Sequence, residues 1–338
     1  MRILVTGGAG YIGSHTVLSL AEAGYSVLIT DNYSNSSPEA LNRIRSLTKI
    51  EIPFEFCELT DGEATDRLFD AYPDIEAVIH FAGLKAVGES VKKPLLYFDN
   101  NLKSTLNLLF SMKKHGVNAF VFSSSATVYG DPASLPIRED FPLHVTSPYG
   151  RTKLIIEDIL RDVAASDPAL RVSILRYFNP VGAHPSGMLG EDPNDIPNNL
   201  MPYIAQVAVG KLAQVHVFGN DYPTPDGTGV RDYIHVMDLA KGHVAALRAL
   251  KSPGVYTYNL GTGRGYSVLD VLHAYERACG HAIAYQIDPR RAGDIASCYA
   301  DSSLAERELQ WKAELDIDAM CRDSWNFQRN NPNGYHKA

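Results

Sequence analysis

A glycine-rich segment near the start of the chain restricts the possible folds more than any other feature. Residues 7–13 read Gly-Gly-Ala-Gly-Tyr-Ile-Gly and follow directly on a short apolar segment, residues 2–6. Residues 14–23 then carry apolar side chains at helical spacing. Glycine permits a tight turn and lets the backbone approach a pyrophosphate at a helix N-terminus. The sequence therefore predicts a strand, a phosphate-binding turn at Gly7, Gly10 and Gly13, and a helix.

A carboxylate follows at the position where a dinucleotide-binding fold needs one. The apolar segment 26–30 ends at Asp31, which is about 20 residues beyond the glycine turn. A carboxylate there binds the two ribose hydroxyls of adenosine, and its negative charge repels a 2′-phosphate. The pattern therefore predicts NAD rather than NADP as the cofactor.

Strands and helices are expected to alternate as far as residue 176. Strand ends are expected near residues 57, 80, 123 and 177, and helices over residues 36–47, 62–72, 91–115 and 147–166. Alternation of this kind is typical of an α/β fold with a doubly wound parallel (Rossmann) sheet, which binds ligands at the carboxyl ends of its strands. Proline-rich and shorter elements follow. We expect an NAD-binding domain over 1–176 and a smaller, mainly substrate-binding α/β lobe over 177–338, with an interleaved boundary and parts that return to the sheet.

Composition favours a soluble enzyme. The 338 residues carry a net charge of −8 without a basic stripe, so nucleic acid is not an expected partner. No apolar stretch reaches the roughly 20 residues of a membrane span, and we expect no membrane partner. The four cysteines, Cys57, Cys279, Cys298 and Cys321, are scattered. This pattern indicates reduced thiols in the cytoplasm and no metal site.

Tyr149 and Lys153 are candidates for acid–base chemistry. They lie four residues apart, which places both on one face of a helix. An ammonium group near a phenol favours the phenolate, so the pKa of Tyr149 is expected to move toward neutrality. Such a phenol can take a proton from a sugar hydroxyl. Because this spacing also arises by chance, an exposed aromatic beside a solvated lysine is the alternative.

The chain resembles the extended short-chain dehydrogenase/reductase family, and within it the UDP-hexose 4-epimerases. The resemblance rests on residues 6–13, 80–90, 123–130, 149–153 and 175–180, and continues through residues 196–200, 227–236 and 290–291. It implies an isomerase of galactose metabolism that inverts C4 of UDP-galactose and UDP-glucose. A transient 4-keto sugar would turn over in the site, and NAD would stay bound.

The resemblance also implies roles for three catalytic residues. Tyr149 would remove the proton from the 4-hydroxyl, Ser125 would share that hydrogen bond, and Lys153 would bind the nicotinamide ribose.

Further contacts are implied by the same resemblance. The cofactor would contact Gly7, Gly10, Tyr11, Ile12, Gly13, Asp31, Asn32, Asn35, Ser36, Glu58, Leu59, Phe81, Ala82, Gly83, Lys85, Asn100, Ser125, Tyr149, Lys153 and Phe178. The UDP-hexose would contact Ser125, Tyr149, Asn179, Asn199, Leu200, Val217, Phe218, Arg231, Arg291, Asp294 and Cys298. Glu58-Leu59 stands where the family commonly has Asp-Ile, so the adenine contact departs from the family pattern.

One position predicts a broader substrate range. The residue beside the hexose 2-position is Cys298, where many bacterial relatives have tyrosine, and Tyr299 is the next residue. Neighbours in an extended segment point to opposite sides, so Tyr299 does not replace it. The smaller cysteine should admit an N-acetyl group, which predicts activity on UDP-GlcNAc and UDP-GalNAc.

Two other functions share part of this pattern. A nucleotide-sugar 4,6-dehydratase would need an Asp-Glu pair after Ser125, where this chain has Ala126-Thr127. An NAD-binding sensor would not need the intact Ser125, Tyr149 and Lys153.

The resemblance further implies a homodimer. Its subunits would pair through the predicted helices 91–115 and 147–166, with Leu102, Leu106, Leu109, Ile155 and Ile159 as candidate contacts. The same residues fit an intramolecular core.

Overall fold

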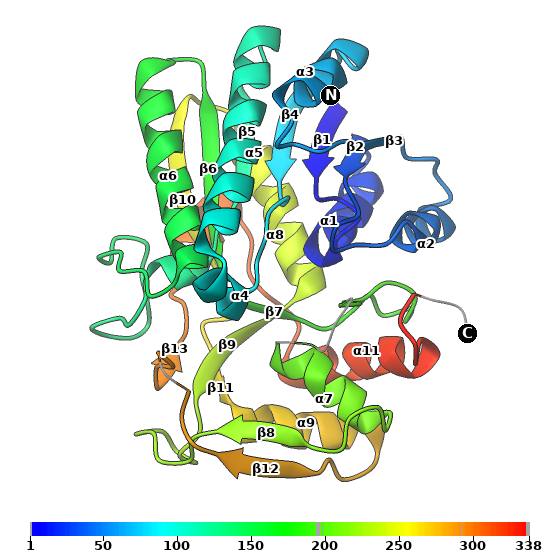
Figure 1. Ribbon diagram of the computed structural model, residues 1–338, viewed down its shortest axis with the longest axis vertical. Coiled ribbons are helices and arrows are strands. Elements are labelled where there is room, and N and C mark those ends of the chain that lie inside the picture. Colours follow the sequence, from blue (N-terminus) through cyan, green and yellow to red (C-terminus); the bar gives the residue numbers. More distant parts are fainter. Residues whose placement is uncertain (1, 194–196, 198, 292, 336–338) are drawn as a thin grey trace.

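A seven-stranded parallel sheet organises the first part of the molecule. The computed structural model describes residues 2–193, 197, 199–291 and 293–335 (Figure 1), so Ile196 and Asn198 of the segment 196–200 lie outside the described residues. The strands lie in the order β10-β6-β5-β4-β1-β2-β3, and every neighbouring pair is parallel. Their bounds are β1 Arg2–Thr6, β2 Ser26–Asp31, β3 Phe54–Phe56, β4 Ile75–His80, β5 Ala119–Ser123, β6 Arg171–Tyr177 and β10 Gly254–Leu260. The predicted doubly wound α/β fold is confirmed.

Helices cover both faces of this sheet. On one face α1 (Tyr11–Glu22) packs between α2 (Glu39–Thr48) and α8 (Val236–Ala249), and on the other α5 (Pro94–His115) packs between α3 (Gly62–Ala71) and α6 (Pro148–Ser166). Each face has its own apolar core, built from residues of the strands and of the covering helices. Since both faces are buried, the inner strands β1, β4 and β5 are rich in buried apolar residues.

The predicted helix 91–115 is wrong at its start. The structure has a short helix α4 (Val87–Lys92), and α5 begins at Pro94. Proline cannot donate a backbone hydrogen bond to the preceding turn, whereas the first turn of a helix needs no such donor. Pro94 therefore separates two helices where the apolar periodicity alone predicted one.

The second lobe lies below the carboxyl ends of the sheet in the view of Figure 1. Its main sheet joins β7 (Asn179–Val181), β9 (Val230–His235), β11 (Gly265–Ser267) and β13 (Ser297–Cys298), and β8 (Val215–Phe218) pairs with β12 (Tyr285–Asp288). Its helices are α7 (Leu200–Ala208), α9 (Val268–Cys279) and α11 (Ile317–Asn330) around a third core. Between these elements the chain returns to the first domain through α8, β10 and α10 (Ser303–Leu309).

Candidate active site

The glycine turn between β1 and α1 has no room for side chains. Gly7 has φ of +66°, and a Cβ on it would lie 2.7 Å from the amide nitrogen of Ala82. A Cβ on Gly13 would lie 2.2 Å from the carbonyl oxygen of Gly7. The first turn of α1 therefore packs directly on the backbone of the turn. Gly10 precedes the helix and adds no side chain, so the helix N-terminus remains a backbone site suited to a phosphate group.

Asp31 closes β2 beside this turn. Its Oδ2 accepts a hydrogen bond from the amide of Ala9 (3.1 Å), and its Oδ1 accepts from the amide of Tyr33 (2.9 Å) and the hydroxyl of Ser36 (2.8 Å). An ionised carboxylate has about four acceptor positions, so one remains for a ribose hydroxyl. Ser36 supports the carboxylate from within the protein.

The predicted adenine side contains a second carboxylate. Asn32 donates to Glu58 over 2.7 Å, which aligns both side chains at neighbouring strand ends. Asn35 is exposed nearby. Leu59, in contrast, is buried in the core beneath α3 and α5, so little of its surface is available to a ligand.

The loop after β4 is fixed by a residue that sequence reasoning missed. Asn101 is buried on α5, and its amide accepts from Leu84 N (2.8 Å) and donates to Leu84 O (3.0 Å). The predicted contact Asn100 donates to the same Asn101 side chain (3.0 Å). The loop carries the predicted contacts Phe81, Ala82, Gly83 and Lys85. A buried Asn in an apolar helix could have signalled this role, because such a group needs hydrogen-bond partners.

Ser125, Tyr149 and Lys153 meet where β5 ends and α6 begins. Ser147 caps α6 by accepting from Gly150 N (3.1 Å), and Pro148 occupies the first turn, which fixes Tyr149 and Lys153 one turn apart. All three side chains are buried. The ammonium nitrogen of Lys153 donates to Ser123 O (2.7 Å) and lies 5.9 Å from the centroid of the Tyr149 ring.

The predicted direction of the pKa shift at Tyr149 is wrong for this buried site. Burial raises the pKa of this phenol well above its ordinary value, nearby Tyr177 raises it further, and a hydrogen bond with Ser125 acts in the opposite direction. Burial also lowers the pKa of Lys153, to about 8. The spacing in the sequence showed that the two groups are neighbours, but it could not show how strongly the interior disfavours both charges.

A buried ion pair supports the end of β5. Glu157 accepts from Ser124 Oγ (2.7 Å) and from Arg176 Nη2 (2.6 Å), one turn beyond Lys153. Sequence reasoning missed this pair because Glu157 and Arg176 belong to different elements, α6 and β6.

The predicted substrate contacts form three groups in the second lobe. The guanidinium of Arg291 lies over the ring of Phe218 (4.7 Å to the centroid) and donates to Asp294 (2.9 Å). Arg231 pairs with Cys298 in the β9–β13 register. The third group contains the exposed residues Asn179 and Asn199, each at the start of an element.

Two predicted contacts have little exposed surface. Val217 is 1% exposed in the core of the second lobe, so it can face a ligand only through its backbone. Phe178 is buried in a cluster with Val128 and Tyr129, and Cys298 packs against this cluster.

Comparisons with known proteins agree with this arrangement. A family model described as the NAD dependent epimerase/dehydratase family matches residues 3–261. This chain belongs to that family. It is similar to the UDP-glucose 4-epimerase of Bacillus subtilis, with 60% identity over the whole of both chains, and to that of Homo sapiens, with 56% identity over 99% of this chain and 98% of the relative. The predicted resemblance is confirmed.

A solved structure shows the same fold. The UDP-glucose 4-epimerase of Bifidobacterium longum, crystallised in complex with NAD+ and UDP, has a TM-score of 0.96 and 59% identity, covering 99% of this chain and 100% of its own. Because the family is NAD-dependent by its description, the cofactor predicted from Asp31 and the glycine turn is confirmed.

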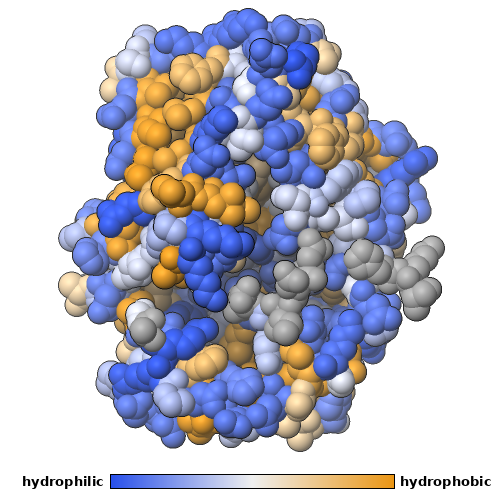
Figure 2. Space-filling view, in the orientation of Figure 1, coloured by the Kyte–Doolittle hydropathy of each residue, from blue (hydrophilic) through white to orange (hydrophobic). Residues whose placement is uncertain are grey.

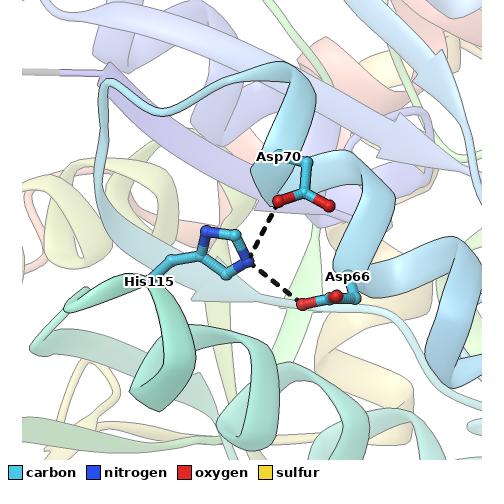
Figure 3. A group of neighbouring side chains, drawn as sticks. All are labelled: Asp66, Asp70 and His115. Carbon is cyan, nitrogen blue, oxygen red and sulfur yellow. Dashed lines mark hydrogen bonds and ion pairs between the residues drawn. The ribbon is translucent and has the colours of Figure 1, made fainter.

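One group of side chains outside the site has the composition of a metal site. In the part of the chain that the structure describes, Asp66, Asp70 and His115 bring ligand atoms within 4.8 Å of one another (Figure 3). Asp66 is also paired with Lys114. Asp66 and Asp70 lie on α3, and His115 is the last residue of α5. None of these three residues is among the predicted site residues.

Among the described residues, no helix combines the length and apolar character needed to cross a membrane.

Proposed function

We propose that this protein interconverts UDP-galactose and UDP-glucose by inverting C4 of the hexose. One observation supports this proposal above the others. The chain brings Ser125, Tyr149 and Lys153 together at the edge of the parallel sheet that also carries the glycine turn. It does so in a sequence that is 56–61% identical, over nearly its full length, to proteins named UDP-glucose 4-epimerase.

The residues of the first domain fit NAD. Backbone groups of the glycine turn would hold the pyrophosphate, and Asp31 would bind the adenosine ribose with its remaining acceptor position. Bound NAD would supply a hydride acceptor beside C4 and the donor for its return. Lys153 would orient the nicotinamide ribose through its ammonium group.

Tyr149 would act as the general base. Burial raises the pKa of its phenol, which disfavours the phenolate that a base requires. Lys153 and the positive ring of the bound cofactor would both stabilise the phenolate. Tyr149 would then take the proton of the 4-hydroxyl, directly or through Ser125, and return it after the transient 4-keto sugar has turned over.

The second lobe would bind the nucleotide diphosphate. Arg231 and Arg291 carry planar guanidinium groups, which bind two phosphate oxygens at once. A protein of net charge −8 needs such local cations to bind a dianion. Phe218 and Asp294, which contact Arg291, would lie beside the uridine.

We infer that N-acetylated sugars are also substrates. Cys298 packs against the cluster that contains Val128 and Phe178, whereas the ring of Tyr299 lies near Gly265. A cysteine at the predicted position beside the hexose 2-position would leave space for an N-acetyl group, and hence for UDP-GlcNAc and UDP-GalNAc.

Product analysis tests the proposed reaction. The purified protein should convert UDP-galactose to UDP-glucose without added NAD, and Tyr149→Phe should reduce kcat by about 10²–10⁴-fold, because a general base is lost. A stable keto product would indicate the dehydratase instead, and Ala126-Thr127 offers no titratable pair for that reaction. Full activity of Tyr149→Phe would refute the proposed mechanism.

We further propose a cytoplasmic homodimer. All four cysteines, each within the described part of the chain, are free thiols, which supports a reducing compartment. Figure 2 shows hydrophobic side chains gathered over α5 and α6. Leu95 and Phe110 of α5 are 82% and 70% exposed. Of the residues predicted for this contact, Leu109 is buried in the intramolecular core, whereas Leu106 and Ile155 remain partly exposed.

A further inference from the structure

Glu191 connects the cofactor side of the site to the substrate side. A single oxygen, Oε1, accepts from Lys85 Nζ (3.2 Å) and from Asn199 Nδ2 (3.3 Å). Lys85 lies in the loop after β4, and Asn199 lies directly before α7. The Glu191 side chain is 11% exposed, whereas that of Lys85 is 50% exposed. The Glu191 carboxylate is therefore largely shielded from solvent, between Lys85 and Asn199.

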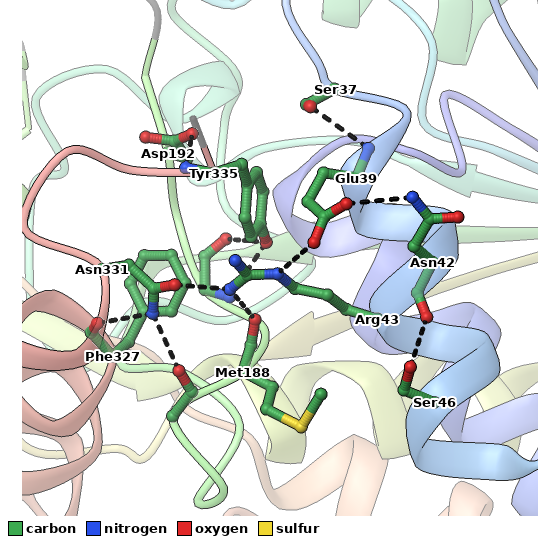
Figure 4. A network of polar contacts seen from close by, with 12 residues as sticks. Ser37, Glu39, Asn42, Arg43, Ser46, Met188, Asp192, Phe327, Asn331 and Tyr335 are labelled. Atoms are coloured by element: carbon green, nitrogen blue, oxygen red, sulfur yellow. Dashed lines mark hydrogen bonds and ion pairs between the residues drawn. The ribbon is translucent and has the colours of Figure 1, made fainter. Parts of the chain in front are cut away.

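The loop that carries Glu191 is held on the side before this residue (Figure 4). Arg43 of α2 donates to Met188 O (2.6 Å) and to Asn331 Oδ1 (2.6 Å). Asn331 donates in turn to Gly187 O (2.9 Å). Two parts of the chain that are distant in sequence, α2 and the segment after α11, thus fix the backbone leading to Glu191.

The loop is also held immediately around Glu191. Tyr335 Oη donates to Gly190 O (3.0 Å), and Tyr335 N donates to Asp192 Oδ2 (2.8 Å). The ring of Tyr335 lies under the guanidinium of Arg43, 4.6 Å from its carbon. Both neighbours of Glu191 are therefore hydrogen-bonded, which restricts where its carboxylate can point.

The negative charge of Glu191 also acts on Tyr11, the first residue of α1. The hydroxyl of Tyr11 donates to Gly182 O (2.7 Å), and its pKa is raised by burial and then by the negative charge of Glu191. Glu191 therefore lies among Tyr11, Lys85 and Asn199, which are all predicted ligand contacts.

We propose that Glu191 is a positioning residue for the nucleotide diphosphate: held by Lys85, it orients the amide of Asn199 toward the substrate. This inference rests on the proposed function. An amide nitrogen carries two hydrogens, and an ammonium carries three. Glu191 uses one hydrogen of each, so Asn199 and Lys85 keep donors for an anion. Glu191 thereby couples the loop after β4 to the start of α7.

A double-mutant cycle on UDP binding tests this role. The measurement is calorimetry with UDP on the NAD-loaded protein, for wild type, Glu191→Ala, Asn199→Ala and the double variant. We expect each single variant to bind UDP about tenfold more weakly, as expected for one lost hydrogen bond to a charged group. The double variant should bind about as weakly as Asn199→Ala alone, because Glu191 acts through Asn199.

Kinetics separate positioning from general damage. Glu191→Ala should raise KM for UDP-galactose about tenfold and leave kcat within about twofold, as expected when binding is lost equally in ground and transition states. Glu191→Gln keeps an acceptor oxygen and should restore most of the affinity. Glu63→Ala, an exposed ion-paired glutamate on α3, is the matched control and should change nothing.

Several results would overturn the inference. In the binding cycle, these are losses of UDP affinity that add up in the double variant, and normal UDP binding by either single variant or tighter binding by Glu191→Ala. In the kinetics, it is a Glu191→Ala variant that loses kcat while its KM stays unchanged.

These results are distinct from failure of the proposed function. A wild-type protein that binds UDP but does not epimerise UDP-galactose refutes the function, whereas additive losses in an active enzyme refute only the role of Glu191.

Discussion

At the scale of single residues, the site depends on charges that the interior disfavours. Lys153 is the clearest example, since burial lowers its pKa to about 8 although its ammonium donates to Ser123 O. Burying a charged group beside the phenol of Tyr149 costs stability, and this cost can be measured.

Replacing Lys153 by Met should show this cost as a pH dependence. Between pH of about 8 and 10.5 the unfolded wild type binds one more proton than the folded protein, so its free energy of unfolding rises with pH. The Met variant lacks this gain. Its stability relative to wild type should therefore fall over this window, by at most on the order of 3 kcal/mol. Denaturant titrations of the cofactor-free proteins measure the difference, and a pH-independent difference would contradict it.

Cys298 offers a residue-scale test of specificity. Cys298→Tyr should fill the space beside the hexose 2-position and abolish activity on UDP-GlcNAc, while activity on UDP-galactose stays within about threefold, as expected for steric exclusion of one substrate. Product separation with both sugars gives the answer. Cys298→Ser, of similar size, is the control and should retain both activities. Equal loss of both activities in the Tyr variant would contradict the role of this position.

At the scale of elements, the strand–turn–helix unit at the N-terminus depends on close backbone contacts. Gly13→Ala would place a Cβ 2.2 Å from the backbone carbonyl oxygen of Gly7, which is too close for the present turn. The turn must then open and lose its fit to the pyrophosphate.

We expect the NAD content of purified Gly13→Ala to fall by about tenfold or more, which corresponds to about 1.4 kcal/mol of lost binding free energy. Extraction and absorbance measure the cofactor. Gly88→Ala is the matched control, because a Cβ on Gly88 meets no heavy atom within 4 Å. Unchanged NAD in Gly13→Ala would show that the turn tolerates a side chain.

At the scale of the whole molecule, the exposed apolar face of α5 is the contact proposed for a second subunit. Phe110→Asp should place a charge in the proposed contact and shift the protein from dimer to monomer in analytical ultracentrifugation, with an affinity loss on the order of a hundredfold for a central aromatic. Ile50→Asp, which changes another exposed apolar residue beyond α2, should leave the assembly unchanged. A wild-type monomer would refute the proposed dimer.

The sequence by itself determined the local elements and the type of cofactor site. The spacing of Gly7, Gly10 and Gly13, the position of Asp31 and the alternation of apolar segments are local signals, because a tight turn or a parallel strand restricts the residues that form it. For the same reason the ends of β4, β5 and β6 fall where the sequence predicts them. Pro94 was misjudged because periodicity continues across a helix break.

Only the tertiary structure decided which distant residues meet and which charges the site can hold. The bridge from Lys85 through Glu191 to Asn199, the clamp of Asn101 on Leu84 and the direction of the pKa shift at Tyr149 all depend on burial and on contacts between different elements. Desolvation and long-range hydrogen bonds arise only in the folded protein, because they depend on residues from different elements. The spacing of residues in the sequence reports only on the geometry within a single helix, strand or turn.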